Sequence, residues 1–167
     1  ERDLSKHVEK QLVSSLGDLP RLRHFYGRSQ ELENMVNLLE ARSTTLMIPG
    51  IAGIGKTAMA AKIIESFMHR RNLLYHRCQD WDGSRALFEN IADWLSNIGD
   101  PMLSEYISAT PVPKPGDAAD LIIDALDNTP ALIVIDDYHK VSDKALHQMV
   151  QALSRGLVDS EGDVGLV

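Results

Sequence analysis

The sequence has a single cysteine, no long apolar run and no excess of positive charge, and each of these absences excludes a class of protein. One cysteine, Cys78, cannot form a disulfide framework within the chain, which favours a reducing compartment. No apolar stretch approaches the roughly 20 residues that span a bilayer, and no secretory signal opens the sequence. We therefore expect a cytoplasmic protein without a membrane partner.

The charge of the chain is acidic overall. There are 17 lysine and arginine residues against 24 aspartate and glutamate residues, which gives a formal net charge of -7. A sequence-independent grip on nucleic acid needs clustered cations that displace counterions. We therefore expect contact with nucleic acid only through domains outside this sequence. The six histidines and the cysteine also lack the spacing of metal ligands.

The length of 167 residues suits one domain with a buried core. Apolar residues recur at every fourth position over 3–16, which predicts a helix, and residues 17–23 around Pro20 are typical of a linker. The chain begins without methionine and stops at Val167 in what resembles a strand. We therefore expect a piece of a longer protein.

Short apolar runs alternate with helical patterns along the rest of the chain. Strands are predicted at 44–48, 73–78, 131–135 and from 164 onward. Helices are predicted at 29–39 (with Ser29 as the cap), 57–71, 84–97, 102–107, 117–126 and 143–153. Strands that alternate with helices imply an α/β fold in which the strands pair in parallel.

Residues Gly50–Thr57 match the phosphate-binding loop G-x-x-x-x-G-K-[ST] at every required position. Glycines let the backbone amides of residues 53–57 approach phosphate oxygens closely, and the helix that follows adds a positive end. Lys56 is expected to reach the β- and γ-phosphates as a point charge, and the Thr57 hydroxyl to bind Mg²⁺. The predicted nucleotide-binding residues of the loop are Gly50, Ala52, Gly53, Ile54, Gly55, Lys56, Thr57 and Ala58.

The loop by itself does not distinguish ATP from GTP. The sequence contains no Asn-Lys-x-Asp segment that would read guanine, which favours adenine and hence ATP or ADP as the ligand.

A second acidic motif follows the apolar run at 131–135. Asp136 and Asp137 are placed at the end of a strand, where ligands of parallel sheets bind. Asp136 is expected to hold the magnesium shell through water. Asp137 could orient or deprotonate the attacking water, or act only as a partner in the second shell. Lys56 and Asp137 are the predicted catalytic residues.

Three segments together resemble the STAND class of signalling ATPases within the AAA-like group. Phe25–Leu32 is similar to the hhGRxxEL signature of that group, Gly50–Thr57 has its additional Gly53, and Leu132–His139 is similar to its Walker B segment in MalT-type and archaeal members. The resemblance covers residues 22–167.

The resemblance implies a fold and a set of roles. The fold would be a P-loop NTPase three-layer αβα sandwich, with the sensor strand from Val164 between the Walker A and Walker B strands. Phe25, Tyr26 and Gly27 would line the adenine pocket, and Arg28 would lie near the nucleotide or brace this segment. The predicted division is an N-terminal helix and linker at 1–21, then a partial P-loop domain at 22–167.

The function that the resemblance implies is a nucleotide-dependent switch. ADP would favour a closed monomer, and ATP an open state that associates with itself or with other domains. Hydrolysis by this fragment would be slow or absent, because the sensor residue and closing subdomains would follow Val167. The alternatives are an AAA-like nucleic-acid-associated ATPase, a P-loop kinase, or a module that binds without catalysis. No arginine-rich lid lies between Leu103 and Lys114, and the second acid is Asp137 where a loader carries glutamate.

Overall fold

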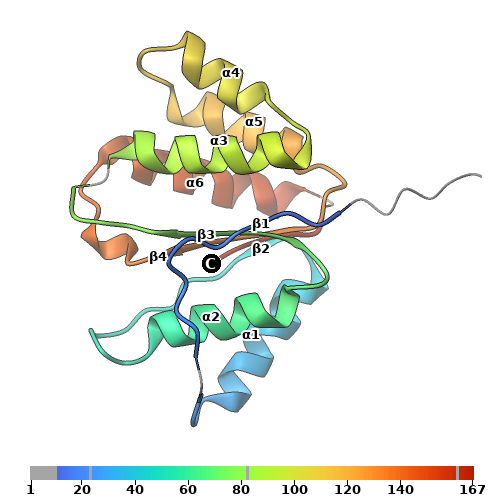
Figure 1. The fold of residues 1–167 in the computed structure, drawn as a ribbon, viewed down its shortest axis with the longest axis vertical. Helices are drawn as coiled ribbons and strands as arrows, with labels where there is room; N and C mark the ends of the chain where they lie inside the picture. Colours follow the sequence, from blue (N-terminus) through green and yellow to red (C-terminus); the bar gives the residue numbers. More distant parts are fainter. Residues whose placement is uncertain (1–10, 23, 82, 161) are drawn as a thin grey trace, which may run out of the picture.

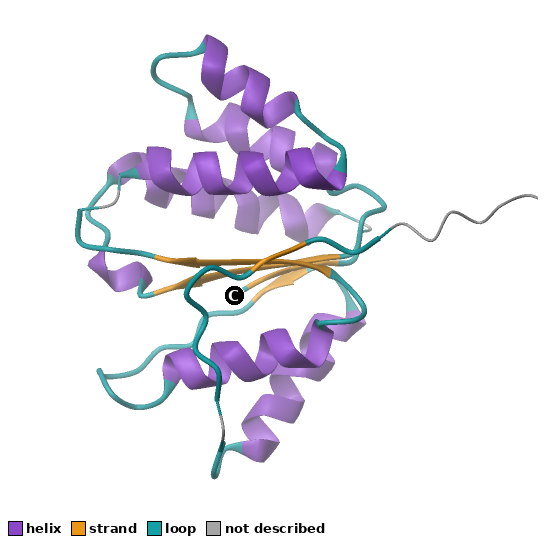
Figure 2. Cartoon of the chain, in the orientation of Figure 1, coloured by secondary structure: helices purple, strands orange, loops and turns teal. Residues whose placement is uncertain are grey.

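The computed structural model describes residues 11–22, 24–81, 83–160 and 162–167. A five-stranded sheet lies between α1 and α2 on one face and a thicker helical layer on the other (Figure 1, Figure 2). The helices are α1 (Ser29–Ala41), α2 (Lys56–Phe67), α3 (Ser84–Ile98), α4 (Met102–Ala109), α5 (Pro115–Ala125) and α6 (Lys144–Asp159), with a 3-10 helix η1 (Tyr138–Lys140). The strands are β1 (Ser14–Ser15), β2 (Thr44–Thr45), β3 (Asn72–Arg77), β4 (Ala131–Asp136) and β5 (Val164–Leu166).

The strands pair in parallel in the order β1-β3-β4-β5-β2. Strand β5, for which the resemblance implies the sensor role, therefore lies between β2, which leads into the phosphate loop, and β4, which ends at Asp136. Both the predicted α/β class and this strand order are confirmed. Since all strands run the same way, the carboxyl ends of β2 and β4 open on one edge of the sheet.

Alternate side chains of the central strands fill two separate cores. Leu73, Tyr75 and Leu132 pack against α1 and α2, whereas Leu74 and Ile133 pack against the layer of α3 to α6. All five side chains are at most 2% exposed. A strand buried on both faces has no polar face, which explains why β4 is a continuous apolar run in the sequence.

The helices predicted from residue 29 onward are confirmed, with shifts at their ends. The inner face predicted for α3 is buried, with Trp94 at 1% exposure. Helix α6 continues to Asp159, six residues beyond the prediction, and η1 was not predicted. Ser29 is the first residue of α1, whose N-cap is Arg28. No helix of the described ranges combines the length and apolar character that crossing a bilayer requires.

The helix predicted over 3–16 is wrong where the structure describes it, and residues 3–10 lie outside the described part. Ser14–Ser15 form β1 on the edge of the sheet. The N–H of Val13 donates to Asn72 Oδ1 at 2.8 Å, and its carbonyl accepts from the Leu73 N–H at 2.9 Å. The unpaired edge of β3 offers hydrogen-bond partners to this segment, which therefore forms a strand although its apolar spacing also fits a helix.

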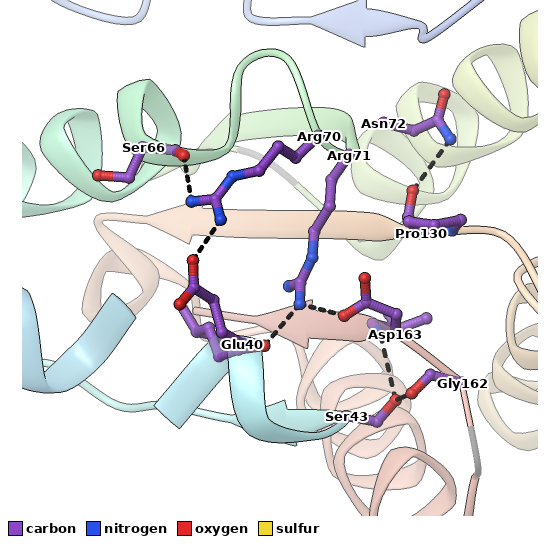
Figure 3. Close-up of polar contacts among 11 residues, drawn as sticks. Glu40, Ser43, Ser66, Arg70, Arg71, Asn72, Pro130, Gly162 and Asp163 are labelled. Atoms are coloured by element: carbon purple, nitrogen blue, oxygen red, sulfur yellow. Dashed lines mark hydrogen bonds and ion pairs between the residues drawn. The ribbon is translucent and has the colours of Figure 1, made fainter. Parts of the chain in front are cut away.

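A polar network ties the strands together at their amino ends (Figure 3). Arg71, directly before β3, is 2% exposed. Its guanidinium donates to the carbonyl of Leu39 at 2.5 Å and pairs with Asp163, directly before β5. The same group lies 4.5 Å from the ring centroid of Phe67. Arg71 therefore joins α1, α2 and two strands at one point.

Asn72 and Ser43 extend this network to the other strands (Figure 3). The Asn72 amide donates to the carbonyl of Pro130, before β4, at 3.0 Å. The Ser43 hydroxyl donates to the carbonyl of Gly162 at 2.6 Å and accepts from the N–H of Val164 at 3.1 Å. With the β1 bond described above, the amino ends of all five strands of this sheet are linked.

A single carboxylate caps two helices at the opposite edge. Asp143 Oδ1 accepts from the N–H groups of Ala145 at 2.7 Å and Leu146 at 3.3 Å, at the start of α6. Asp143 Oδ2 accepts from the N–H of Ser84, the first residue of α3, at 2.7 Å. These bonds, above all the one from Ser84, lower the pKa of Asp143.

Replacing Asp143 with alanine is expected to lower the free energy of unfolding by about 1–2 kcal/mol, because two helix starts lose their acceptor. The folded pKa lies below the unfolded value of about 4. The stabilisation is therefore complete above that value and is lost as pH falls through the folded pKa. Urea denaturation of the unmodified chain and of Asp143→Ala, from neutral to acidic pH, measures how the difference in their free energies of unfolding depends on pH.

Asp120→Ala is the control, because Asp120 is an exposed acid of α5. It should show little change in stability at any pH. A deficit of Asp143→Ala that persists undiminished at strongly acidic pH would contradict the capping role.

Gly165, in the central strand β5, faces a filled core. A β-carbon there would lie 2.7 Å from Leu39 Cδ2 and 2.8 Å from Leu132 Cδ1. Gly165→Ala is expected to lower the free energy of unfolding by about 1–3 kcal/mol through overpacking. The control is Gly116→Ala in α5, where a β-carbon meets no atom within 4 Å. Equal unfolding midpoints in urea for the two variants would show that β5 has room.

Candidate nucleotide-binding site

The phosphate loop joins β2 to the first turn of α2, and three of its glycines have a positive φ. Gly50, Gly53 and Gly55 have φ values of 155°, 82° and 90°. A β-carbon on Gly50 would lie 2.8 Å from Ile54 Cγ2, whereas one on Gly53 would meet no atom within 4 Å. The loop therefore has the conformation that only glycine adopts easily, and the space beside Gly53 is open.

Lys56 curls back over this loop. Its ammonium donates to the carbonyls of Gly50 at 2.8 Å and Ile51 at 3.0 Å. Lys56 is also the first residue of α2, and Thr57 and Ala58 follow in its first turn. The first turn of a helix has unpaired N–H groups and a partial positive charge. The loop thus brings together one full positive charge and the partial charge of a helix end.

Asp136 contacts the loop directly, while its predicted role of holding the magnesium shell through water stays a prediction. Its Oδ2 accepts from the Thr57 hydroxyl at 2.7 Å and from the Tyr75 hydroxyl at 2.9 Å. Its Oδ1 accepts from the N–H of Asp137 at 2.8 Å. Burial, and then the bond to Asp136, raise the pKa of Tyr75, so its hydroxyl remains a donor. A hydroxyl and a carboxylate oxygen this close are a donor set that suits Mg²⁺.

Asp137 lies next to this pair but is held by two cations. Its Oδ2 accepts from Lys140 at 2.9 Å and from Arg77 at 3.0 Å. The bond from Lys140, helped by Arg77, lowers the pKa of Asp137. Its backbone has a φ of 55°, which aspartate tolerates in turns. Sequence reasoning found neither cation, because Arg77 reaches Asp137 only through the pairing of β3 with β4, and Lys140 reaches it through η1, which was not predicted.

Arg28 connects the segment before α1 with the phosphate loop. Its guanidinium donates to Glu31 at 2.6 and 3.0 Å and to the carbonyl of Ile54 at 3.1 Å. Phe25 is partly buried against the core between the sheet and helices α1 and α2, whereas Tyr26 is 85% exposed. Arg28 therefore contacts the loop, while its bracing role and the roles of Phe25, Tyr26 and Gly27 at adenine stay predictions.

A cavity of about 570 Å³ opens beside the loop at the carboxyl edge of the sheet. The ends of β2, β4 and β5 and the face of α6 contribute to its wall. Predicted site residues in the wall are Gly50, Ala52, Lys56, Asp136 and Asp137. The wall also includes His139, together with apolar side chains such as Met47 and Val150.

A glycine loop between a strand and a helix, with a carboxylate from another strand of the same parallel sheet at its Thr57, defines a P-loop NTPase. The family profile of the AAA ATPase domain matches residues 24–161. The chain belongs to this family of nucleotide-binding ATPase modules, whose members typically bind ATP or ADP with Mg²⁺.

The fold is also similar to a solved structure. A chain in the structure of Drosophila ORC bound to DNA superposes with a TM-score of 0.55 at 14% identity, and the match covers 89% of this chain. The match spans 39% of that Drosophila chain. At this identity the likeness concerns the fold alone. No curated protein matches the sequence.

Arg28→Ala is expected to weaken binding of an ATP analogue by roughly fivefold, the effect of losing an exposed charge-assisted hydrogen bond. The loop loses its tie at Ile54, while the core is untouched. Calorimetric titration measures the affinity. Arg85→Ala is the control, because Arg85 is an exposed arginine of α3 that pairs with Glu89 of the same helix at 2.7 Å. Equal affinities of Arg28→Ala and Arg85→Ala would show that the hydrogen bond from Arg28 to Ile54 does not stabilise the loop for binding.

Proposed function

We propose that this chain binds ATP and ADP together with Mg²⁺ as the nucleotide-binding module of a larger ATPase. Lys56 and the loop amides hold the phosphates, while Thr57 and Asp136 are the groups directed at magnesium. When bound, Mg²⁺ would neutralise charge on the phosphate oxygens.

The contact between Thr57 and Asp136 carries this proposal. The two residues are 79 positions apart in sequence, yet their oxygens lie 2.7 Å from each other. Glycine loops occur in many proteins, but a loop whose last hydroxyl meets a buried carboxylate has a place for a cation next to its phosphates. Family membership supports the same ligand.

Hydrolysis by this chain is proposed to be slow or absent. A general base acts best when its pKa lies near the working pH. The pKa of Asp137 is lowered by Lys140 and Arg77, so its carboxylate is a weak base. Phosphoryl transfer depends on positioned charges, and Asp137 would have to leave both cations to act on water. Its assignment as a catalytic residue therefore remains part of the proposal.

The larger protein is proposed to act as a cytoplasmic switch of the STAND type. The support is the resemblance of Phe25–Leu32 and Leu132–His139 to that class, together with the contact of Arg28 with the loop. A switch requires that ADP and ATP bind its two states with different affinity. Sedimentation of the longer protein with each nucleotide tests this, since an unchanged oligomeric state would contradict it.

A nucleic-acid-associated AAA ATPase is the second candidate function. The ORC chain with a similar fold belongs to a complex that is bound to DNA. The formal net charge of -7 means that this chain is not expected to grip DNA itself. DNA binding by the longer protein that requires ATP would favour this candidate, whereas no binding with either nucleotide would favour the signalling switch.

Lys56→Ala tests the site directly. The affinity for an ATP analogue should fall by at least about a hundredfold, because the loop loses its one formal positive charge. Lys62→Ala is a matched control on the same helix, where Lys62 pairs with Glu65 at 2.5 Å. Calorimetry should show unaltered binding for Lys62→Ala. Unchanged affinity of a folded Lys56→Ala protein, as judged by circular dichroism, would overturn the site assignment.

A further inference from the structure

The side chain of Tyr75 lies in the core between the sheet and helices α1 and α2, and its hydroxyl contacts the carboxylate of Asp136. Tyr75 is in the middle of β3 and is 2% exposed. Its hydroxyl donates to Asp136 Oδ2 at 2.9 Å. Along the sequence this residue is one more member of an apolar strand, and nothing in the phosphate-loop chemistry requires a tyrosine there.

The hydroxyl is not needed to fill the core. Tyr75 belongs with Leu73, Leu132 and Val134 to the core between the sheet and helices α1 and α2. A phenylalanine would fill the same space without bringing a polar group into it. A buried hydroxyl costs free energy unless it has a partner, and here the partner is Asp136. The tyrosine therefore serves the carboxylate rather than the packing.

Tyr75 and Thr57 share one oxygen of Asp136 but approach it from different elements. Thr57 belongs to the first turn of α2 and is itself directed at magnesium. Tyr75 belongs to the sheet, as does the backbone that leads to Asp137, whose N–H holds the other carboxylate oxygen. Tyr75 and this N–H fix both oxygens of Asp136 from the sheet side, so the carboxylate is oriented independently of the loop.

We propose that Tyr75 is a positioning residue that orients Asp136 for the magnesium complex of the nucleotide. Donors to the ligands of a metal site commonly change metal affinity by about 10- to 100-fold. The role rests on the proposed function. Tyr75 acts on the gain in nucleotide affinity that Mg²⁺ brings, not on the affinity for the phosphates alone.

The test is Tyr75→Phe in the 167-residue chain, titrated calorimetrically with a non-hydrolysable ATP analogue. Each protein is measured with Mg²⁺ and with EDTA. The ratio of the two affinities is expected to fall about tenfold in Tyr75→Phe, while the affinity in EDTA is unchanged. A purely structural role would instead lower both affinities together, and that result would overturn the proposal.

Tyr106→Phe is the matched control. The Tyr106 hydroxyl also donates to a carboxylate, that of Asp117 at 3.3 Å, but in α4 and α5. Its loss should leave the magnesium gain as in the unmodified chain. If Tyr106→Phe lowered the ratio of the affinities with Mg²⁺ and with EDTA as much as Tyr75→Phe does, the proposal would be overturned. The effect would then not be specific to the donor to Asp136.

A double-mutant cycle locates the effect. In an Asp136→Ala background, Tyr75→Phe should cause no further loss of magnesium gain, because its hydroxyl no longer has the carboxylate to orient. An additional tenfold loss in that background would mean that Tyr75 acts elsewhere. If the unmodified chain shows no magnesium gain, the proposed function itself fails. If it shows the gain and Tyr75→Phe keeps it, only the role of Tyr75 fails.

Discussion

The structure depends on how a carboxylate is accommodated at the end of a strand that is covered on both faces. Asp136 is 7% exposed, and a charged group at that depth requires hydrogen-bond donors. Within the described part of the chain, its donors are the hydroxyls of Thr57 and Tyr75 and the N–H of Asp137. These donors belong to α2, to β3 and to the turn after β4. One buried charge therefore joins the phosphate loop to the centre of the sheet.

Polar groups stabilise the sheet at the amino ends of its strands, whereas they surround the phosphate loop at the carboxyl ends. At the amino ends, Arg71, Asn72 and Ser43 bond to backbone and side-chain groups of neighbouring strands, which fixes the strands against one another. At the carboxyl ends, the charged groups surround the open loop and the cavity beside it. Among the described non-glycine residues with a positive φ, Arg28 and Asp137 lie at this second edge, and Asn128 lies in the turn before β4 at the other edge.

Most of the elements could be predicted because their apolar patterns match how they are buried. The inner face of α3 and the apolar run of β4 are read correctly for this reason. The N-terminal segment could not be, because the four-residue spacing through Leu12 and Leu16 fits a helix as well as it fits an edge strand. Its conformation is decided by the bonds that the edge of β3 offers to Val13, and a local pattern carries no information about that edge.

The sequence by itself determined the phosphate loop, its acidic partner and the α/β class, because glycine spacing and burial periodicity are local properties of the chain. Only the tertiary structure decided what surrounds Asp136 and Asp137. Tyr75 and Arg77 reach the two acids from β3, across a strand pairing that no spacing rule encodes, and Lys140 reaches Asp137 through η1, which was not predicted. The phosphate loop is thus identified by its motif, while the state of its two carboxylates follows from the packing of distant segments.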